Sequence, residues 1–517
     1  MNTLTAPRQK PAPRLRRRLF TLVAIAAGST IALAGCATNA DTGSASADGA
    51  AQSTVTVALT DEPSSLDPLF DTNLPALNVF YNVFDQLATI DATGAVVPRL
   101  ATSWTKSDDL MTWVFTLRDD AKFSDGTAVT ADDVVFTYET AKNDPKSNLG
   151  GYLSDMTSVV ATSPTEVTFT LAAPFAPWDR QTTLVPIVDK AAYTSMGAAE
   201  FAKKPVGSGP YSVEKWVKGD SITLTRNDSY WGNKGEYATV VFTPVPDETT
   251  RANSVQSGDL DIALLGPSQV SAVKASNTVD VVDQQSNRIL YTGFNAKAKW
   301  LDDPNIRKAI DEAIDRTSLS DDLLNGSVTP TSQLVAAATF GFDTTNSATA
   351  FDLDAAKTLI AASGYDGSAI TLSYPTTGLP QIDQIAQAIG GYLKAAGLNI
   401  TLDGQETSTY SSAWFSASLP GIYLYAFAPS VMDADLPMTM LLKTGGQGYI
   451  SDAEIDRLLS EQVADPDLTT RAADIASISK IVNENTYYAP LFIDTYTYGV
   501  KQGLDFTPRP DGFYIFN

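Results

Sequence analysis

Residues 370–402 contain a strand, a helix and a second strand in succession, and this order limits the folds open to the chain. Ile370–Tyr374 and Leu398–Leu402 are predicted strands. Between them, Gln381–Ala396 carries apolar side chains on one face at helical spacing, and Gly397 ends the pattern. Two strands joined through a helix pair in parallel, because antiparallel neighbours need only a short turn. We therefore predict a parallel sheet covered by helices, and an α/β fold class.

The same spacing rules predict further elements along the chain. Strands are expected over Val55–Leu59, Thr112–Arg118, Glu166–Leu171, Ile222–Thr225 and Gly421–Phe427, and helices over Leu77–Leu87, Pro304–Arg316, Asp452–Glu461 and Thr470–Asn483. Thr130 and Asp133 form a capping-box pair that begins one more helix. Asp303 is the expected N-cap of the helix that starts at Pro304.

The only cysteine of the chain, Cys36, follows a basic cluster at Arg14–Arg18 and an apolar run at Leu19–Ala34. The apolar run is too short for a permanent membrane span and is typical of a signal peptide. Leu33-Ala34-Gly35-Cys36 resembles a bacterial lipobox, which implies cleavage before Cys36 and a lipid on its sulfur. The alternative is an ordinary signal peptide followed by a buried free cysteine. The arginines also loosely resemble a twin-arginine signal, so both export routes stay open.

The chain after the signal peptide divides into a tether and a folded part. The small polar residues up to residue 53 cannot form a core and are expected to be flexible. The remainder is too long for one core, so we predict two lobes with an inserted region. The predicted ranges are a signal peptide at 1–35, a tether at 36–53, a first lobe at 54–84, 186–290 and 487–517, an inserted region at 85–185, and a second lobe at 291–486. The cleft between two such lobes is the usual place for a ligand.

Charge and residue inventory exclude several classes of function. The formal net charge of −23 repels phosphate groups, so nucleic acid is not expected as a partner. The chain has no histidine, which excludes Ser-His-Asp and Cys-His catalysis. Zinc sites built from histidine and cysteine are excluded for the same reason. A glycosidase with two carboxylates stays open in principle, but we expect a binding protein without enzymatic activity, metal or other cofactor.

Four groups of short motifs follow one another between residues 81 and 316. They are Tyr81–Leu87, Val97–Trp104, Trp113–Gly126 and Thr130–Val135; Pro205–Tyr211 and Arg226–Gly232; Thr249–Arg251 and Ser257–Asp261; and Phe294–Asn295, Ile306–Ile310 and Ala313–Arg316. In this order they resemble the large extracytoplasmic solute-binding proteins of ABC importers, family 5, which bind peptides, nickel chelates or opines. We read the motifs themselves as structural rather than as ligand contacts.

The resemblance implies a two-lobed periplasmic-binding-protein-like fold of type II, in the large cluster with an extra inserted subdomain. It also implies a monomeric lipoprotein, anchored through Cys36 to the outer face of the cell membrane. Its partners would be a small solute, a membrane permease and the ATPase subunits of the importer. The lobes would close over the solute by hinge motion, with crossings expected near Val206–Tyr211 and Tyr291–Asn295.

The ligand itself is less constrained by the resemblance. In peptide-binding members an aspartate of the second lobe pairs with the free amine, and here that position holds Ser430. Asp433 or Asp435 could substitute for it. Ala428-Pro429 and the aromatic Tyr152 are similar to nickel-binding members, although no histidine and no matching cleft arginine is found. We expect a peptide, and the alternatives are a metal–chelator complex, a sugar oligomer or an opine.

The candidate cleft residues combine aromatic and acidic side chains. They are Glu62, Tyr152, Trp178, Trp414, Phe427, Asp433 and Asp435. For each aromatic residue the alternative is packing in a core, and for each acid it is a solvated charge in a loop. A bound peptide would be held largely through its backbone, as in strand addition.

Overall fold

The structure, a computed structural model of the chain, describes residues 52–446 and 449–516. The predicted signal peptide, Cys36 and nearly all of the predicted tether lie outside the described residues. Strand β1 (Gln52–Leu59) begins two residues before Thr54, where the predicted first lobe starts. Within the described ranges, no helix combines the length and the apolar character that crossing a membrane requires.

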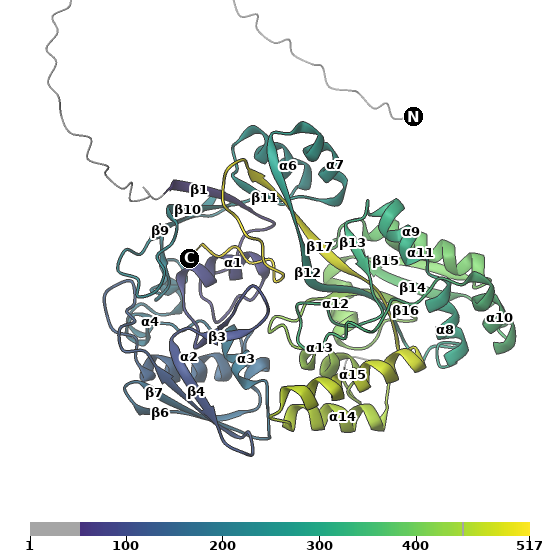
Figure 1. Cartoon of the computed structure of the whole chain (residues 1–517), viewed down its shortest axis with the longest axis horizontal. Coiled ribbons are helices and arrows are strands. Elements are labelled where there is room, and N and C mark those ends of the chain that lie inside the picture. The colour runs from purple at the N-terminus through teal and green to yellow at the C-terminus, as the bar shows by residue number, and fades with distance from the viewer. Residues whose placement is uncertain (1–51, 447–448, 517) are drawn as a thin grey trace, which may run out of the picture. The chain divides into compact units, whose positions relative to one another are not determined.

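One 11-stranded sheet runs through both lobes (Figure 1). The first lobe contributes β1, β8 (Tyr211–Val217), β9 (Ser221–Arg226), β10 (Tyr237–Pro244) and β11 (Ile262–Leu264). The second lobe contributes β13 (Val328–Pro330), β14 (Ile370–Pro375), β15 (Ile400–Gln405) and β16 (Ile422–Phe427). The long antiparallel strands β12 (Val279–Phe294) and β17 (Tyr488–Lys501) lie between the two groups and join them.

The strand pair β12–β17 is the connection between the lobes. β17 pairs with β11 at one end, and β12 pairs with β16 at the other. The register of β12 against β17 shifts between Gln285 and Ile289, and again between Leu290 and Tyr291. Such irregularities bend a strand and interrupt its ladder. The predicted crossing at Tyr291–Asn295 therefore lies on the connecting strand, but the larger interruption falls just before it.

The predicted strand–helix–strand unit is confirmed. β14 and β15 pair in parallel from Ile370 with Ile400 to Pro375 with Gln405. Helix α11 (Ile382–Ala396) connects them and buries its apolar face in the core of the second lobe. Gly397 ends the helix with a φ of 109°, a conformation that costs other residues energy.

The inserted region has its own antiparallel sheet. The order of its strands is β4 (Ala101–Lys106), β5 (Thr112–Leu117), β7 (Glu166–Leu171) and β6 (Met156–Ser163), and β2 (Ala88–Ile90) with β3 (Val96–Pro98) forms a separate hairpin. Helix α2 (Ala131–Asn143) begins with the predicted capping box: the Asp133 carboxylate accepts from the backbone N–H of Thr130 at 2.9 Å. The remaining short helices are the 3-10 helix at Gly150–Leu153, α3 (Trp178–Gln181) and the 3-10 helix at Thr182–Leu184.

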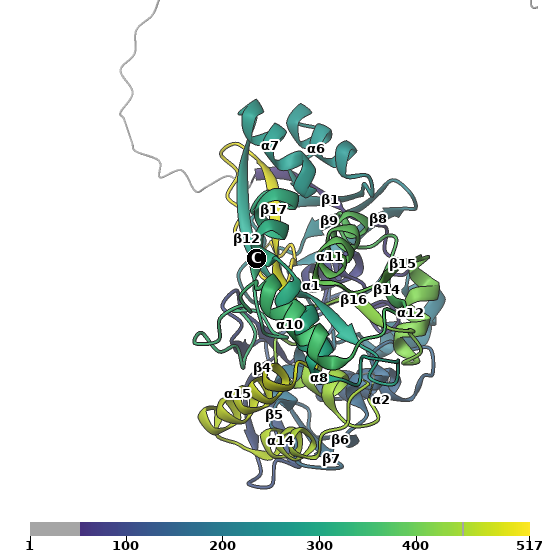
Figure 2. The ribbon, with the colours of Figure 1, turned by 90° about the vertical axis from the view of Figure 1, so that its right-hand side faces the viewer.

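Helices flank the large sheet in both lobes (Figures 1 and 2). In the first lobe they are α1 (Leu74–Val83), α4 (Lys190–Met196), α5 (Ala198–Phe201), α6 (Glu248–Ser257) and α7 (Pro267–Ser276). In the second lobe they are α8 (Pro304–Ala313), α9 (Arg316–Ser318), a short helix at Leu319–Leu323, α10 (Leu353–Ser363), α11, α12 (Thr407–Phe415), α13 (Asp435–Leu442), α14 (Ala453–Ala464) and α15 (Leu468–Asn485). The predicted helices at 452–461 and 470–483 correspond to α14 and α15.

The first predicted helix is wrong at its C-terminal end. It was expected over 77–87, whereas α1 ends at Val83. Asp85 is buried and accepts hydrogen bonds from Arg99 Nε at 2.6 Å and from the Tyr230 hydroxyl at 3.0 Å. These partners are far away in the sequence and hold the chain in an extended path, which a local periodicity does not reveal.

The helix that begins at Pro304 also ends earlier than predicted, at Ala313. Its predicted N-cap is confirmed, because the Asp303 side chain accepts from the backbone N–H of Asn305. At the other end, Asp315 accepts from the N–H of Ser318 and starts the short helix α9. A second cap within the apolar pattern thus divides the predicted helix.

The cores follow the lobes only in part. Val55, Phe115, Phe169 and Phe516 belong to one continuous cluster, which joins the first lobe and the inserted region. The second lobe has separate clusters on the two sides of its sheet. The predicted boundary between the first lobe and the inserted region is therefore not marked by a separate core.

Gly207 and Gly209 allow a close passage inside the first lobe. A Cβ atom on Gly207 would lie 2.1 Å from the carbonyl oxygen of Val83 at the end of α1. Gly209 N–H donates to the same oxygen at 2.9 Å. The chain then continues into β8, within the same lobe. The prediction of an inter-lobe crossing at Val206–Tyr211 is therefore wrong. Gly207 and Gly209 are needed because the backbone of this segment packs directly on the backbone at the end of α1, where a side chain would clash.

Candidate ligand-binding site between the lobes

Two cavities lie between the second lobe and the rest of the molecule. Cavity A has a volume of about 510 Å³ and cavity B about 390 Å³. Tyr152, Ser154, Asp155, Phe175 and Gln181 of the inserted region line cavity A, opposite Asp435, Thr439, Lys443, Leu459 and Val463 of the second lobe. Thr60, Leu74, Glu248 and Arg251 of the first lobe line cavity B, opposite Gly378, Leu379, Pro380 and Gln381 of the second lobe. A solute in either cavity would contact both of its walls.

Asp435 is a partly buried carboxylate on the wall of cavity A. It stands at the start of α13, where the helix dipole favours negative charge. Thr439 Oγ1 donates to its Oδ1 at 3.0 Å, and Gln462 Nε2 donates to the same atom. Burial and the neighbouring charge of Asp433 raise the pKa of Asp435 to about 6. Among the described residues, no lysine or arginine lies within hydrogen-bonding distance of this carboxylate.

Replacing Asp435 with asparagine is expected to change how stability depends on pH. The folded protein holds the Asp435 proton more tightly than the unfolded chain, so the contribution of Asp435 to the stability of wild type falls as the pH rises from about 4 to about 6. Asp435→Asn does not titrate there. The free energy of unfolding of Asp435→Asn minus that of wild type should therefore be larger at about pH 7.5 than at about pH 4.5. Urea unfolding curves at the two pH values measure this difference. Asp228→Asn is the control, because Asp228 is exposed and its substitution should not produce this pH-dependent difference. A difference for Asp435→Asn that is the same at both pH values would contradict the prediction.

The facing wall of cavity A offers hydrogen-bonding groups. Tyr152 lies in the short helix at Gly150–Leu153 and is partly buried. Gln181 Nε2 donates to the carbonyl oxygen of Tyr152 at 3.4 Å, and within the described structure Gln181 Oε1 has no hydrogen-bond partner. A buried acceptor without a partner is costly and is available to a donor on a ligand.

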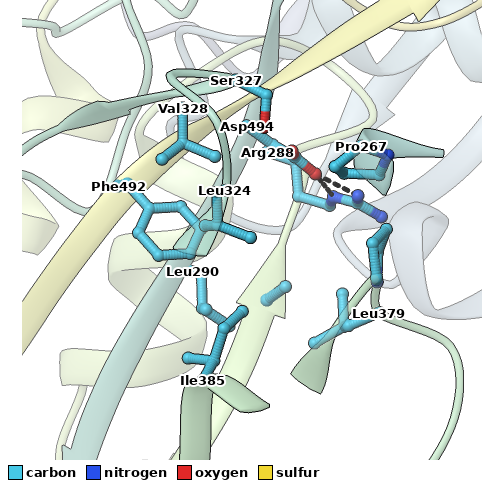
Figure 3. Close-up of a pocket in the computed structure, with 12 residues that line it drawn as sticks. Pro267, Arg288, Leu290, Leu324, Ser327, Val328, Leu379, Ile385, Phe492 and Asp494 are labelled. Atoms are coloured by element: carbon cyan, nitrogen blue, oxygen red, sulfur yellow. Dashed lines mark hydrogen bonds and ion pairs between the residues drawn. The ribbon is translucent and has the colours of Figure 1, made fainter. Parts of the chain in front are cut away.

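An ion pair at the crossing between the lobes lines cavity B and also a smaller adjoining cavity, which is the one drawn in Figure 3. Arg288 of β12 donates through Nε to Asp494 of β17 at 2.8 Å, with a second contact through Nη2. The other walls of this smaller cavity include Leu290, Val328 and Phe492. The nearby Asp494 carboxylate raises the pKa of Arg288, so the guanidinium stays charged. No cleft arginine was matched from the sequence, and the structure supplies one.

Two of the predicted aromatic residues lie in cores. Trp178 and Trp414 are each 1% exposed. Trp178 packs edge-on against Phe169 in the core of the inserted region. Trp414 is stacked on Tyr425, with ring centroids 3.9 Å apart and an angle of 2° between the planes. We therefore assign both indoles to core packing, which the sequence left open as the alternative to a place in the cleft.

Glu62 and Phe427 have local partners. Glu62 Oε1 accepts from Trp216 Nε1 at 3.0 Å and from the N–H of Gly219 at 2.9 Å, and so holds the loop after β1 against β8. Phe427 ends β16 and is partly buried against a core cluster of the second lobe. These contacts give both residues a structural role, whether or not a solute touches them.

Asp433 is fully buried in an ion-pair cluster. Arg471 Nη1 donates to its Oδ2 at 2.8 Å, and Arg471 Nη2 donates to its Oδ1 at 2.5 Å. Arg180 Nε lies 3.3 Å from the same Oδ2. This carboxylate is already neutralised, and it does not line cavity A, unlike Asp435. Sequence reasoning treated the two aspartates as equivalent because it could not locate Arg471.

Comparison with known proteins agrees with this architecture. The family model described as bacterial extracellular solute-binding proteins, family 5 Middle, matches residues 95–449. The chain is 26% identical over 477 residues to the probable D,D-dipeptide-binding periplasmic protein DdpA of Escherichia coli, covering 88% of this chain and 92% of the relative. It is 24% identical over 445 residues to the nickel-binding periplasmic protein of Escherichia coli, covering 79% of this chain and 83% of the relative.

A solved structure shows the same fold. The ABC transporter substrate binding protein CtaP of Listeria monocytogenes superposes with a TM-score of 0.80 at 22% identity, covering 89% of this chain and 98% of that one. The expected two-lobed periplasmic-binding-protein-like fold is thereby confirmed. The match of the family model to most of the chain shows that this protein belongs to the family 5 extracellular solute-binding proteins of bacterial ABC importers.

Proposed function

We propose that the protein captures a peptide with a free amino terminus in the cleft between its lobes and delivers it to the permease of an ABC importer. The observation that carries the peptide assignment is Asp435, a partly buried carboxylate on the wall of cavity A that lacks a cationic partner within hydrogen-bonding distance among the described residues. A peptide ammonium group would supply that charge. The dipeptide-binding relative supports the same class of solute.

The other walls suit an extended peptide backbone. Ser154, Gln181 and Thr439 offer donors and acceptors in cavity A, while Phe175 and Leu459 offer apolar surface. Backbone groups of a peptide need such hydrogen bonds when they leave water. We further propose that a lipid on Cys36 and the segment 36–53 hold the protein at the outer face of the membrane; the lipobox sequence supports this.

The test compares trialanine with N-acetyl-trialanine, which lacks the ammonium group. Wild type should bind trialanine at least about tenfold more tightly in calorimetry, and Asp435→Asn should lose most of this preference. Asp228→Asn is the control, since Asp228 is an exposed acid paired with Arg226. Equal binding of the two peptides to wild type would contradict recognition of a free amino terminus. If neither peptide binds, the assignment of a peptide as the ligand is contradicted.

A metal–chelator complex is the second candidate. The nickel-binding relative favours it, and Arg288 in cavity B, which is paired with Asp494, would share its guanidinium with a chelator carboxylate. Native mass spectrometry of protein purified without added chelator separates the two candidates. A peptide ligand would give a spread of excess masses, whereas a metal complex would give one excess mass with the isotope pattern of the metal.

A further inference from the structure

Arg180 crosses from the inserted region to the second lobe. It belongs to α3, and its Nη1 donates to the carbonyl oxygens of Val431 and Met432, each at 3.3 Å. Its Nε lies 3.3 Å from Oδ2 of Asp433. The Arg180 side chain is only 14% exposed, so these contacts lie largely out of water. One guanidinium thus bridges the two walls that form cavity A.

The site that receives Arg180 is built by the second lobe alone. Arg471 of α15 holds Asp433 through two charge-assisted hydrogen bonds, and both side chains are 1% exposed. The ring of Phe340 lies 4.7 Å from the guanidinium carbon of Arg471 and 5.7 Å from that of Arg180. Because Arg471 balances Asp433 by itself, the receiving site keeps a paired charge when Arg180 leaves.

Further contacts cross the same boundary around Arg180. The N–H of Ala176 donates to the carbonyl oxygen of Val463 on α14 at 2.6 Å. Gly94, at the tip of the β2–β3 hairpin, packs so closely on the second lobe that a Cβ atom would lie 2.4 Å from Ala338 O. The amide of Ala176 therefore reports directly on whether the two walls are in contact.

The cluster also connects to the wall of cavity A. Arg471 Nε donates to Gln462 Oε1 at 3.0 Å, and Gln462 Nε2 donates to Asp435 Oδ1. The backbone N–H of Asp435 donates to Oδ1 of Asp433 at 2.9 Å. The residues that receive Arg180 thus also fix the direction of the Asp435 carboxylate.

We propose that Arg180 is a positioning residue: it locks the inserted region onto the second lobe and so strengthens the binding of any solute in cavity A without touching that solute. This inference rests on the proposed capture of a solute in the cleft. When only the closed form binds tightly, the measured dissociation constant is the intrinsic one divided by the closed fraction. Loss of Arg180 lowers this fraction and weakens every ligand by one common factor.

The first test needs no ligand. In the full chain, Arg180→Met should exchange the Ala176 amide hydrogen at least about fivefold faster than wild type, because the walls separate more often. The amide of Leu171, which donates to Met111 O within the inserted region, should be unchanged. Arg457→Met is the matched control, since Arg457 is an exposed arginine of α14 whose ion pairs with Glu454 and Glu461 stay on its own helix.

Gly94→Ala provides a second variant at the same boundary, where Arg180 Nη1 also donates to the carbonyl oxygen of Gly94 at 3.0 Å. Its added methyl group would press on Ala338 O and should also speed exchange at Ala176 while leaving Leu171 unchanged. Faster exchange at both amides would indicate unfolding of the inserted region and would count against a local lock. Unchanged exchange at Ala176 in Arg180→Met would overturn the proposal outright.

The second test uses the two trialanine probes. Arg180→Met should raise both dissociation constants by the same factor, so their ratio stays at the wild-type value. A change in the ratio would show that Arg180 affects the choice between the two probes, by contact with the solute or through the Asp435 carboxylate, and would contradict an effect on closure alone. If wild type binds neither probe, the peptide assignment fails, while amide exchange at Ala176 still decides the role of Arg180.

Discussion

Replacing Asp433 with alanine is expected to lower the free energy of unfolding by about 3–5 kcal/mol. The Arg471 guanidinium is 1% exposed and would lose both of its charge-assisted hydrogen bonds to Asp433. The remaining bond to Gln462 is made with a neutral group. A buried charge without its counter-ion is among the most destabilising changes that a single substitution can make. Equilibrium unfolding in urea, followed by circular dichroism, measures the loss.

Two further variants show whether the loss comes from the unpaired charge. Asp228→Ala removes an exposed carboxylate from its pair with Arg226 and should cost less than about 1 kcal/mol. The double variant Asp433→Leu with Arg471→Met replaces the fully buried pair by apolar groups and should recover part of the stability lost by Asp433→Ala; Arg180, whose side chain is 14% exposed, still loses its contact with Asp433. A double variant that is less stable than Asp433→Ala would mean that packing, and not charge, dominates at this position.

The change Trp414→Ala is expected to cost a similar amount, about 3–5 kcal/mol, because a large buried side chain leaves a cavity. Trp414 is 1% exposed and loses its stacked contact with Tyr425 when it is truncated. Without this contact α12 packs less tightly on β16, so the thermal midpoint of unfolding should fall. Affinity for trialanine, measured on protein that remains folded, should change little.

The neighbouring Phe415 is the natural control for Trp414. It lies on the same helix and is 58% exposed, so Phe415→Ala should change stability by no more than about 0.5 kcal/mol. If Trp414→Ala instead kept its stability and lost binding, the indole would face the solute, as the sequence first suggested, and its assignment to the core would be wrong.

The sequence predicts correctly those helices and strands that are determined by residues close to one another in the chain. The helix α11, the caps at Thr130 and Asp303, and the parallel pair β14–β15 follow from spacing and capping chemistry within a few residues. The end of α1 was missed because Asp85 is held by Arg99 and Tyr230, which are brought there by the fold.

In the candidate site, too, local features could be predicted and features that depend on distant residues could not. An acidic residue near the end of β16 was expected on the cleft wall, and the structure places Asp435 there. Its neighbour Asp433 looks the same in the sequence, but Arg471, 38 positions further on, takes it out of the cleft. Arg180 and Arg288 gave no sequence signal, since an arginine in a short helix or on a strand is ordinary until its partners are known.

The central position of β17 sets the order in which the chain can complete its structure. This strand pairs with β11 of the first lobe and with β12 and β13 in the same sheet. Residues 488–501 are thus needed by both lobes, and Tyr514 and Phe516 complete the core that begins with Val55. Each lobe can therefore complete its part of the sheet only after residues 488–501 have been synthesised.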